Sequence, residues 1–271
     1  MNNLLLLSHD SELTAHDSQL LYSKKPIKKL DFIPMPLPQY TFTCTQNREI
    51  AHDVHELKFS KPDGFTFQPG QFLMLDVPSL QNPEDLQPRA YSIASTPSEE
   101  EVIIGIKIKH GGRAGEWVKQ LLAPGMEVAV KGPLGVFLLK KETIRDYLFI
   151  CTGAGLAPFR SMVKAALEAG ESRRMDLVHG VCEQQDFFWK EELDALAETY
   201  SNFHVHYTLS KPGPEWQGHT GYVQTVVPRV IENIGERNVY VCGNPVMAGD
   251  CKRLCLEEWG IPKEEFHMEG Y

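Results

Sequence analysis

The chain has 271 residues, a formal net charge of −9, 42% hydrophobic residues and six cysteines. This length suits two modest domains, and the acidic balance argues against a general nucleic-acid binder. The cysteines show neither a disulfide framework nor the four-cysteine run that holds an iron–sulfur cluster, so we expect any such cluster on a separate partner.

Residues 1–38 differ in amino-acid composition from the rest of the chain. They are interpreted as an N-terminal extension that is partly ordered at best. Four consecutive leucines near the start are too short for a membrane span and lack the basic start of a signal peptide. We therefore expect a cytoplasmic protein with no membrane span. Four lysines at positions 24–29 are interpreted as a solvated stretch, with a docking site for an acidic partner as the alternative.

Residues 39–143 have the pattern of a β-domain. Short runs rich in β-branched and aromatic residues are separated by glycine and proline. They predict strands at residues 40–46, 50–59, 71–77, 89–95, 102–109 and 127–131, with one helix near 115–122. Six strands at this spacing predict a small antiparallel β-barrel.

Residues 144–271 alternate between strands and helices, which predicts an α/β domain with a parallel sheet. Strands are expected at residues 147–151, 176–181, 203–209 and 238–242, and helices around 159–167, at 191–200 and at 245–259. Cys251 and Cys255 would share one face of the last helix. We interpret them as a core-facing pair, because no further metal ligands accompany them.

The first motif is Arg89-Ala90-Tyr91-Ser92, on a predicted barrel strand. Arginine suits phosphate binding, a tyrosine ring suits stacking on a flat cofactor, and a serine hydroxyl can bond a ring nitrogen. Because strand side chains alternate, Arg89 and Tyr91 should share a face and Ser92 should point the other way. The alternative is a plain barrel strand with an exposed arginine.

This motif resembles the flavin signature of the ferredoxin–NADP reductase family, close to its plant-type form. The resemblance covers nearly everything after the first forty residues. It implies Arg89 on the flavin phosphates, Tyr91 against the isoalloxazine ring and Ser92 near its reactive N5. Ala90 and Lys107 are also expected among the cofactor-binding residues.

The second motif is a glycine-rich turn that leads into the predicted barrel helix. Backbone N–H groups at such a helix start can receive an anion. By resemblance, Gly112, Arg113, Ala114 and Gly115 cradle the pyrophosphate of FAD. Gly115 stands where the family usually has Ser or Thr, so a hydroxyl contact is lost while the backbone donors remain. FMN is the alternative to FAD.

The third motif follows the strand at 147–151 and opens a helix, the context required for a nucleotide-phosphate loop. By resemblance it binds the nicotinamide nucleotide through Thr152, Gly153, Ala154, Gly155 and Pro158. Cys151 replaces the family's usual first glycine, and we expect this small side chain to be tolerated.

The fourth motif contains Cys242, Gly243 and Met247 at the carboxyl end of a strand, where open α/β sheets bind ligands. A free cysteine is more commonly a buried packing residue. The resemblance instead places Cys242 beside the nicotinamide.

The chain ends in Glu269-Gly270-Tyr271, which resembles the Glu-x-Tyr terminus of plant-type reductases. A terminal tyrosine is otherwise often a frayed end. The resemblance implies that Tyr271 is a movable lid over the flavin, and that Glu269, Ser92 and Cys242 surround the site of hydride transfer.

The coenzyme choice depends on four residues, Ser210, Lys211, Tyr222 and Gln224. NADP-specific plant-type members have a Ser-Arg pair and a Tyr-x-Gln at matching spacing. Lysine at 211 keeps the charge of the family's arginine but loses its fork geometry. We expect NADP(H), with NADH as the alternative, since similar segments occur in NADH-using relatives.

The resemblance thus implies a ferredoxin/flavodoxin–NAD(P)(+) oxidoreductase that contains FAD and no metal. A hydride would pass between NADP(H) and FAD, and single electrons would pass to or from ferredoxin or flavodoxin. We also expect a monomer. The alternatives are an NADH-dependent reductase component of an oxygenase and a non-enzymatic electron-transfer subunit that keeps the fold.

Overall fold

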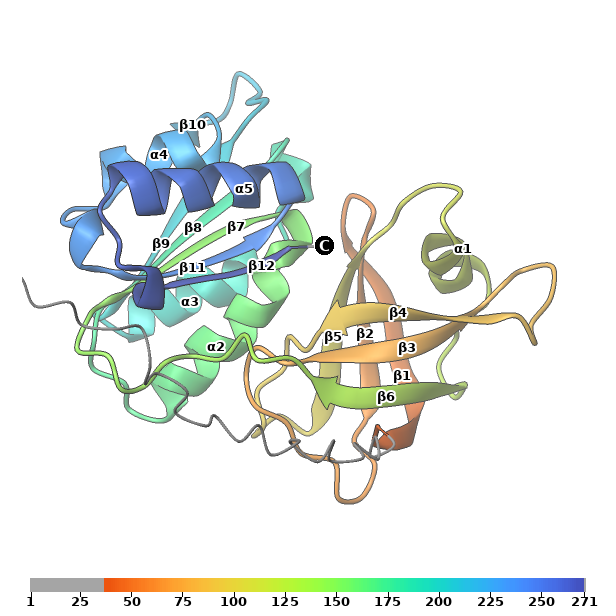
Figure 1. The fold of residues 1–271 in the computed structure, drawn as a ribbon. Helices are drawn as coiled ribbons and strands as arrows, with labels where there is room; N and C mark the ends of the chain where they lie inside the picture. The colour runs from red at the N-terminus through yellow and green to blue at the C-terminus, as the bar shows by residue number, and fades with distance from the viewer. Residues whose placement is uncertain (1–36, 271) are drawn as a thin grey trace, which may run out of the picture. The chain divides into compact units, whose positions relative to one another are not determined.

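The computed structural model describes residues 37–270, so the predicted extension falls outside it except for its last two residues. Within the described part of the chain, no helix is long and apolar enough to cross a membrane. The same residues hold no cluster of three or more His, Cys, Asp or Glu side chains suited to a metal ion. The structure contains two six-stranded sheets, one antiparallel and one parallel (Figure 1).

The first sheet is antiparallel, which confirms the predicted fold of this part. Its strands, in spatial order, are β4 (Leu86–Ser92), β3 (Phe72–Pro78), β6 (Glu127–Leu134), β1 (Gln39–Ala51), β2 (Val54–Ser60) and β5 (Glu101–Lys107). The sheet closes just beyond β4, where the amide of Ala94 donates to the carbonyl of Ile103 at 2.8 Å. Helix α1 (Arg113–Gln120) follows β5.

Two strand boundaries differ from the sequence prediction. The strand predicted at 50–59 is split by a turn, in which Asp53 adopts a left-handed backbone conformation with φ of 55°. Aspartate tolerates this conformation better than most residues do, so the turn leaves only a weak sequence signal. The strand predicted at 89–95 begins earlier and ends at Ser92, since the next residues turn toward β5.

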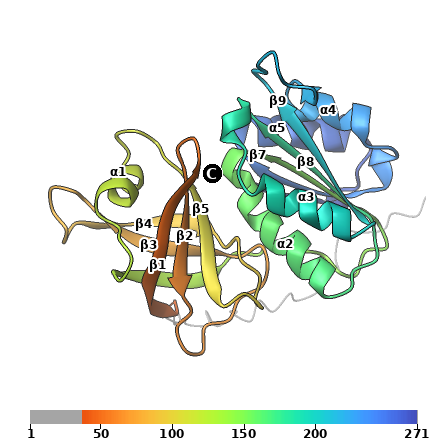
Figure 2. The ribbon, with the colours of Figure 1, turned by 180° about the vertical axis from the view of Figure 1, so that it is seen from behind.

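The second sheet is parallel, as predicted. Its order is β10 (His219–Thr220), β9 (Phe203–Leu209), β8 (Met175–Val181), β7 (Tyr147–Thr152), β11 (Asn238–Gly243) and β12 (Phe266–Gly270). Helices α2 (Leu156–Glu168) and α3 (Lys190–Thr199) cover one face; α4 (Val223–Val230) and α5 (Pro245–Arg253) cover the other (Figures 1 and 2).

The side chains of β7 point alternately to the two faces of the sheet, and each face packs into its own hydrophobic core. Phe149 and Cys151 pack with α2 and α3, whereas Leu148 and Ile150 pack with α4 and α5. A central strand that is buried on both faces reads as an uninterrupted apolar run, which is why it was predictable. The boundary at residues 143 and 144 stays a prediction.

The prediction did not include α4, β10 or β12. The last helix was predicted at 245–259, and the structure is helical from Pro245 to Glu258. The α-helical part ends at Arg253, and residues Leu254–Glu258 form a π-helical turn. Cys251 and Cys255 are both fully buried in the core beside α5, which confirms the core-facing pair.

Candidate active site

A pocket of about 730 Å³ opens at the carboxyl ends of the parallel strands. Loops after β7, β8, β9 and β11 form much of its wall, as expected for an open α/β sheet. Eight of the predicted cofactor-binding residues line it: Lys107, Thr152, Gly153, Ala154, Ser210, Tyr222, Gln224 and Met247. The structure therefore brings together residues that are separated by more than one hundred positions in the chain.

The loop after β7 presents free backbone donors. It forms a short 3-10 turn, Gly153–Gly155, and the first backbone N–H groups of such a turn have no partner within the turn itself. A β-carbon on Gly155 would lie 2.3 Å from the carbonyl oxygen of Cys242, so only glycine lets the loop pack against β11. Donors at the start of a helix suit a pyrophosphate.

The start of α5 lies beside the same pocket but is already satisfied by the protein. The side-chain oxygen of Asn244 accepts from the amides of Val246 at 2.8 Å and Met247 at 3.4 Å. The amide of Asn244 in turn donates to Thr152 Oγ1 at 3.2 Å. Phosphate binding is therefore better supported at Gly153–Gly155 than at α5.

Cys242 and Glu269 lie side by side at the edge of the sheet, on the paired strands β11 and β12. Burial raises the pKa of the Cys242 thiol well above its usual value, and the nearby Glu269 carboxylate raises it further. Burial also raises the pKa of Glu269. Burial therefore disfavours ionisation of both groups. Tyr271, the predicted lid, lies outside the described residues.

The predicted flavin motif lies on β4. Arg89 and Tyr91 pair with Leu75 and Leu73 of β3, so their side chains share the inward face of the strand. Tyr91 is half-buried against the barrel core, and burial raises the pKa of its phenol to about 12. The Arg89 guanidinium bonds the chain next to it, at 2.9 Å from Gln87 Oε1 and 2.9 Å from the Pro88 carbonyl.

Helix α1 begins without a side-chain cap, at Gly112. The amides of Arg113, Ala114 and Gly115 meet no acceptor in the described part of the chain. The Arg113 side chain holds the loop before β4 through a 2.5 Å ion pair with Asp85. Free donors at this helix start, together with an arginine and a tyrosine on β4, fit the phosphates and ring of a flavin dinucleotide.

Gly115 departs from the family pattern for a reason that the structure supplies. A β-carbon there would lie 2.7 Å from the carbonyl oxygen of Lys109 and 3.1 Å from a methyl carbon of Ile108. The close approach of α1 to the preceding strand end therefore excludes a larger side chain.

The predicted residues do not all meet in one place. Ser92 ends β4 in the barrel, does not line the nucleotide pocket and forms no hydrogen bond with Cys242 or Glu269. Five further predicted residues do not line the pocket: Gly155, Pro158, Lys211, Cys242 and Gly243. Lys107 lines the pocket at the parallel sheet, where its Nζ donates to the His52 carbonyl at 2.7 Å.

Sequence reasoning missed several residues that shape this pocket. Asp250 of α5 lines it and accepts from Gln224 Nε2 at 3.2 Å. Asp186 and Phe188, from the segment that connects β8 to α3, also line it. No local motif marks these residues, because the fold alone brings them to the carboxyl edge of the sheet.

Comparison with known proteins agrees with this architecture. Residues 41–138 match the oxidoreductase FAD-binding domain and residues 149–253 match the oxidoreductase NAD-binding domain. Ferredoxin--NADP reductase B of Sorangium cellulosum is 33% identical over 233 residues, which cover 83% of this chain and 94% of that protein.

Two further relatives are longer than the matched region. The ferredoxin--NAD(P)(+) reductase component of naphthalene 1,2-dioxygenase/salicylate 5-hydroxylase systems from a Ralstonia species is 31% identical over 230 residues, which cover 84% of this chain and 68% of that protein. The solved structure of Amycolatopsis cytochrome P450 reductase GcoB is 25% identical, with a TM-score of 0.76 over 86% of this chain and 70% of that one. The chain therefore belongs to the ferredoxin–NADP reductase family of oxidoreductases, which use FAD and a nicotinamide nucleotide.

Proposed function

We propose that this protein transfers a hydride between NADPH and bound FAD and exchanges single electrons with a separate ferredoxin or flavodoxin. The observation that carries the proposal is the pocket beside Gly153–Gly155, where free phosphate-binding donors lie on the same sheet edge as the Cys242–Glu269 pair. Phosphate donors fix the nucleotide, and the sheet edge then offers a buried polar surface for its nicotinamide ring.

On the flavin side, we propose that the α1 amides and Arg89 hold the phosphates, with Tyr91 against the ring. The phenol of Tyr91 stays protonated, since burial raises its pKa to about 12. When bound, FAD accepts two electrons together and releases them one at a time, which links a nicotinamide nucleotide to a one-electron partner.

On the nicotinamide side, we propose that Cys242 and Glu269 orient the ring. Cys242 is fully buried, and its raised pKa keeps it a thiol that does not act as a nucleophile. Burial also raises the pKa of Glu269, and its carboxyl group can accept hydrogen bonds from the bound nucleotide. Ser92 is proposed to act from the flavin side.

The preference for NADPH is proposed from the residues around the far end of the pocket. Tyr222 is 67% exposed and lines the pocket, so its ring face is open to an adenine. Lys211 is exposed, and its amide donates to the carbonyl of Cys182, a residue of the pocket wall, at 2.9 Å. Arg229 adds a second cation, since its Nη2 lies 3.6 Å from where a β-carbon on Gly221 would be.

The test is to record the flavin spectrum of the purified protein and then its reduction by NADPH and by NADH in stopped flow. We expect bound FAD and faster reduction with NADPH. We expect Lys211→Ala to weaken NADPH binding about tenfold and NADH binding little, because only NADPH carries the 2′-phosphate. Lys263→Ala removes an exposed lysine near the opposite, amino end of the sheet and is the matched control.

An NADH-dependent reductase component of an oxygenase is the second candidate. The Ralstonia relative is named as a ferredoxin--NAD(P)(+) reductase component of dioxygenase and hydroxylase systems. The Asp250 carboxylate places negative charge on the pocket wall, which disfavours a 2′-phosphate. Faster reduction with NADH, together with no effect of Lys211→Ala on either nucleotide, would favour this candidate over the first.

A further inference from the structure

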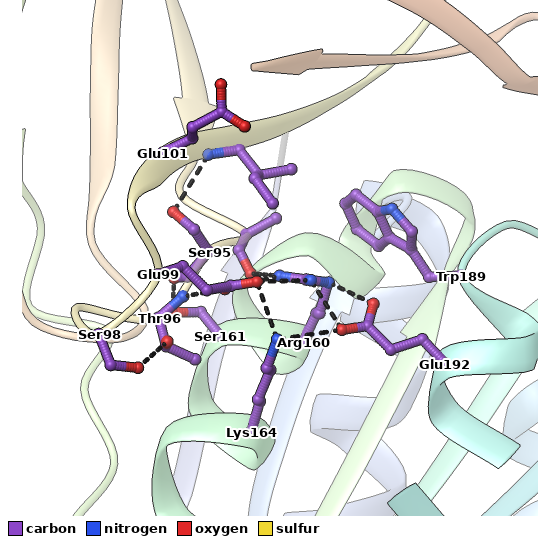
Figure 3. A network of polar contacts seen from close by, with 12 residues as sticks. Ser95, Thr96, Ser98, Glu99, Glu101, Arg160, Ser161, Lys164, Trp189 and Glu192 are labelled. Carbon is purple, nitrogen blue, oxygen red and sulfur yellow. Dashed lines mark hydrogen bonds and ion pairs between the residues drawn. The ribbon is translucent and has the colours of Figure 1, made fainter. Parts of the chain in front are cut away.

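Arg160 is a buried arginine that reaches from the nucleotide half of the protein to the barrel. It lies on α2, shortly after the Gly153–Gly155 turn, and is only 4% exposed. Its Nη1 donates to the Ala94 carbonyl at 2.7 Å, and its guanidinium bonds the Glu99 carboxylate at 3.0 and 3.2 Å. On its other side, Nε and Nη2 donate to Glu192 of α3 at 2.8 and 2.7 Å (Figure 3).

Two neighbours of Arg160 on α2 strengthen this connection. Lys164 Nζ lies 2.8 Å from Glu99 and 3.3 Å from Glu192, so two cations share two carboxylates and the charges balance. Ser161 Oγ donates to the Ser95 carbonyl at 2.6 Å. Every one of these bonds to the barrel reaches the segment between Ala94 and Glu99, which links β4 to β5.

Trp189 makes a second connection beside the first. Its ring lies 5.3 Å from the Arg160 guanidinium, and its Nε1 donates to Glu56 of β2 at 2.7 Å. A β-carbon on Gly105 of β5 would lie 2.9 Å from this ring, so the barrel surface is shaped to receive it. Trp189 has a left-handed backbone with φ of 53°, which is strained for a bulky residue and indicates that the surrounding contacts hold it there.

The position of these contacts along the chain links them to the proposed chemistry. The barrel segment Ala94–Glu99 begins two residues after Ser92, the last residue of the flavin strand. Helix α2 begins directly after Gly153–Gly155, the proposed pyrophosphate loop. A connection between these two segments therefore fixes the flavin strand against the nucleotide loop.

Stability alone is a weak reason to bury these charges. A buried ion pair often contributes no more than well-packed apolar residues of similar size would, because its desolvation offsets much of its attraction. Its directional bonds do, however, favour one relative position of the groups that they join. The Glu99 carboxylate stays charged at ordinary pH, since the bonds from Arg160 and Lys164 outweigh burial and lower its pKa to about 2.

We propose that Arg160, held between Glu99 and Glu192 and covered by Trp189, is a positioning residue that sets the distance between the nicotinamide and flavin sites. This inference rests on the proposed function and extends it. A displacement of about 1 Å in reacting groups can slow a reaction on the order of a hundredfold. Loss of this clasp, defined as Arg160, Glu99, Glu192 and Trp189, should therefore reduce the rate of hydride transfer more than it reduces the affinity for either cofactor.

The experiment compares Arg160→Met with Arg237→Met in the full chain. Arg237 is a matched control, because it is 6% exposed and pairs with the buried Asp176 at 3.1 Å wholly inside the α/β part. Both variants are loaded with FAD, and the limiting rate of flavin reduction and the half-saturating NADPH concentration are measured in stopped flow. Hydrogen exchange of residues 93–103 is followed without nucleotide as a structural readout.

We expect Arg160→Met to lower the limiting rate about tenfold or more while half-saturation changes less than about threefold, and to speed exchange in residues 93–103. Arg160→Lys, which keeps the charge but loses the fork, should fall between wild type and Arg160→Met. Arg237→Met should leave the limiting rate and this segment unchanged.

Equal limiting rates in Arg160→Met and Arg237→Met would overturn the inference, as would unchanged exchange in residues 93–103. If Arg160→Met does not fold, Glu99→Gln takes its place, because it removes one charge at constant size. The same changes in limiting rate, half-saturation and hydrogen exchange are then expected of Glu99→Gln. A wild-type protein that neither nucleotide can reduce would refute the proposed function instead. The exchange comparison would then still decide whether the clasp holds the two sites in place.

Discussion

Cys242 and Glu269 are directly paired across the parallel strands β11 and β12, and both have raised pKa values because they are buried. At this position of the sheet, burial disfavours the ionised form of both side chains. A buried carboxyl of this kind destabilises the fold when it ionises, which makes the role of Glu269 accessible to a stability measurement as well as to kinetics.

We expect Glu269→Gln to stabilise the protein relative to wild type as the pH rises. The pKa of Glu269 in the folded state lies above its ordinary value of 4.5, so its contribution is complete below that value and is lost as the pH rises through the folded pKa. Glutamine cannot ionise, so the variant loses no stability from this cause. Melting temperatures of both proteins between about pH 4 and about pH 8 test this. If the melting temperature of Glu269→Gln fell relative to that of wild type as the pH rose, the prediction would be contradicted.

We expect Ser92→Ala to slow flavin reduction by about tenfold to a hundredfold while FAD stays bound, because a hydroxyl that orients the reacting groups is lost. The half-buried Ser92 makes no side-chain hydrogen bond within residues 37–270, so its removal should hardly alter stability. Ser79→Ala, in an exposed loop of the same sheet, is the control. A wild-type reduction rate in Ser92→Ala would show that Ser92 has no part in the transfer.

The sequence was most informative where a buried strand ends at a glycine-rich turn. The parallel strands are apolar on both faces and end at a glycine turn, so β7 and its loop were predictable together. By contrast, β12 is an edge strand that pairs only with β11 and is half exposed, and its residues carry little strand signal. Its pairing with β11 depends on the whole sheet and cannot be derived from five residues.

The clasp was not predictable for a similar reason. Arg160 follows the predicted nucleotide loop by only a few residues, yet its partners Ala94 and Glu99 are more than sixty positions away. The left-handed backbone of Trp189 breaks the usual preference for glycine or asparagine at such positions. Local propensity cannot anticipate a conformation that only tertiary contacts stabilise.

The buried His179 should make stability depend on pH. It lies fully buried on β8, with its ring edge against Phe187 and Phe188, and burial lowers its pKa to about 4 from an ordinary value of 6.5. Because the folded pKa is depressed, its stabilisation is complete above pH 6.5 and is lost as the pH falls from 6.5 to about 4.

The change in unfolding free energy attributable to His179 should approach about 3 kcal/mol at the low end of that window. His179→Gln removes the titrating group, so its stability should fall less than that of wild type between these pH values. Denaturant unfolding at several pH values measures the difference. Parallel pH profiles for the two proteins would show that another group causes the acid sensitivity.

The last prediction concerns Gly115, one of the residues at which this chain departs from the family pattern. Gly115→Ser restores the usual hydroxyl, yet its β-carbon would approach the Lys109 carbonyl oxygen to 2.7 Å. The carbonyl belongs to the backbone and cannot move without shifting the start of α1. We therefore expect a loss of about 1 to 3 kcal/mol in stability and weaker retention of FAD.

Gly125→Ser is a poor control, because Gly125 has φ of 90°. Ala114→Ser adds a hydroxyl one residue earlier on the same helix turn and is the matched control. Thermal unfolding and the FAD content after gel filtration are the measurements, and tighter FAD retention in Gly115→Ser would show that α1 can adjust to the family's usual residue.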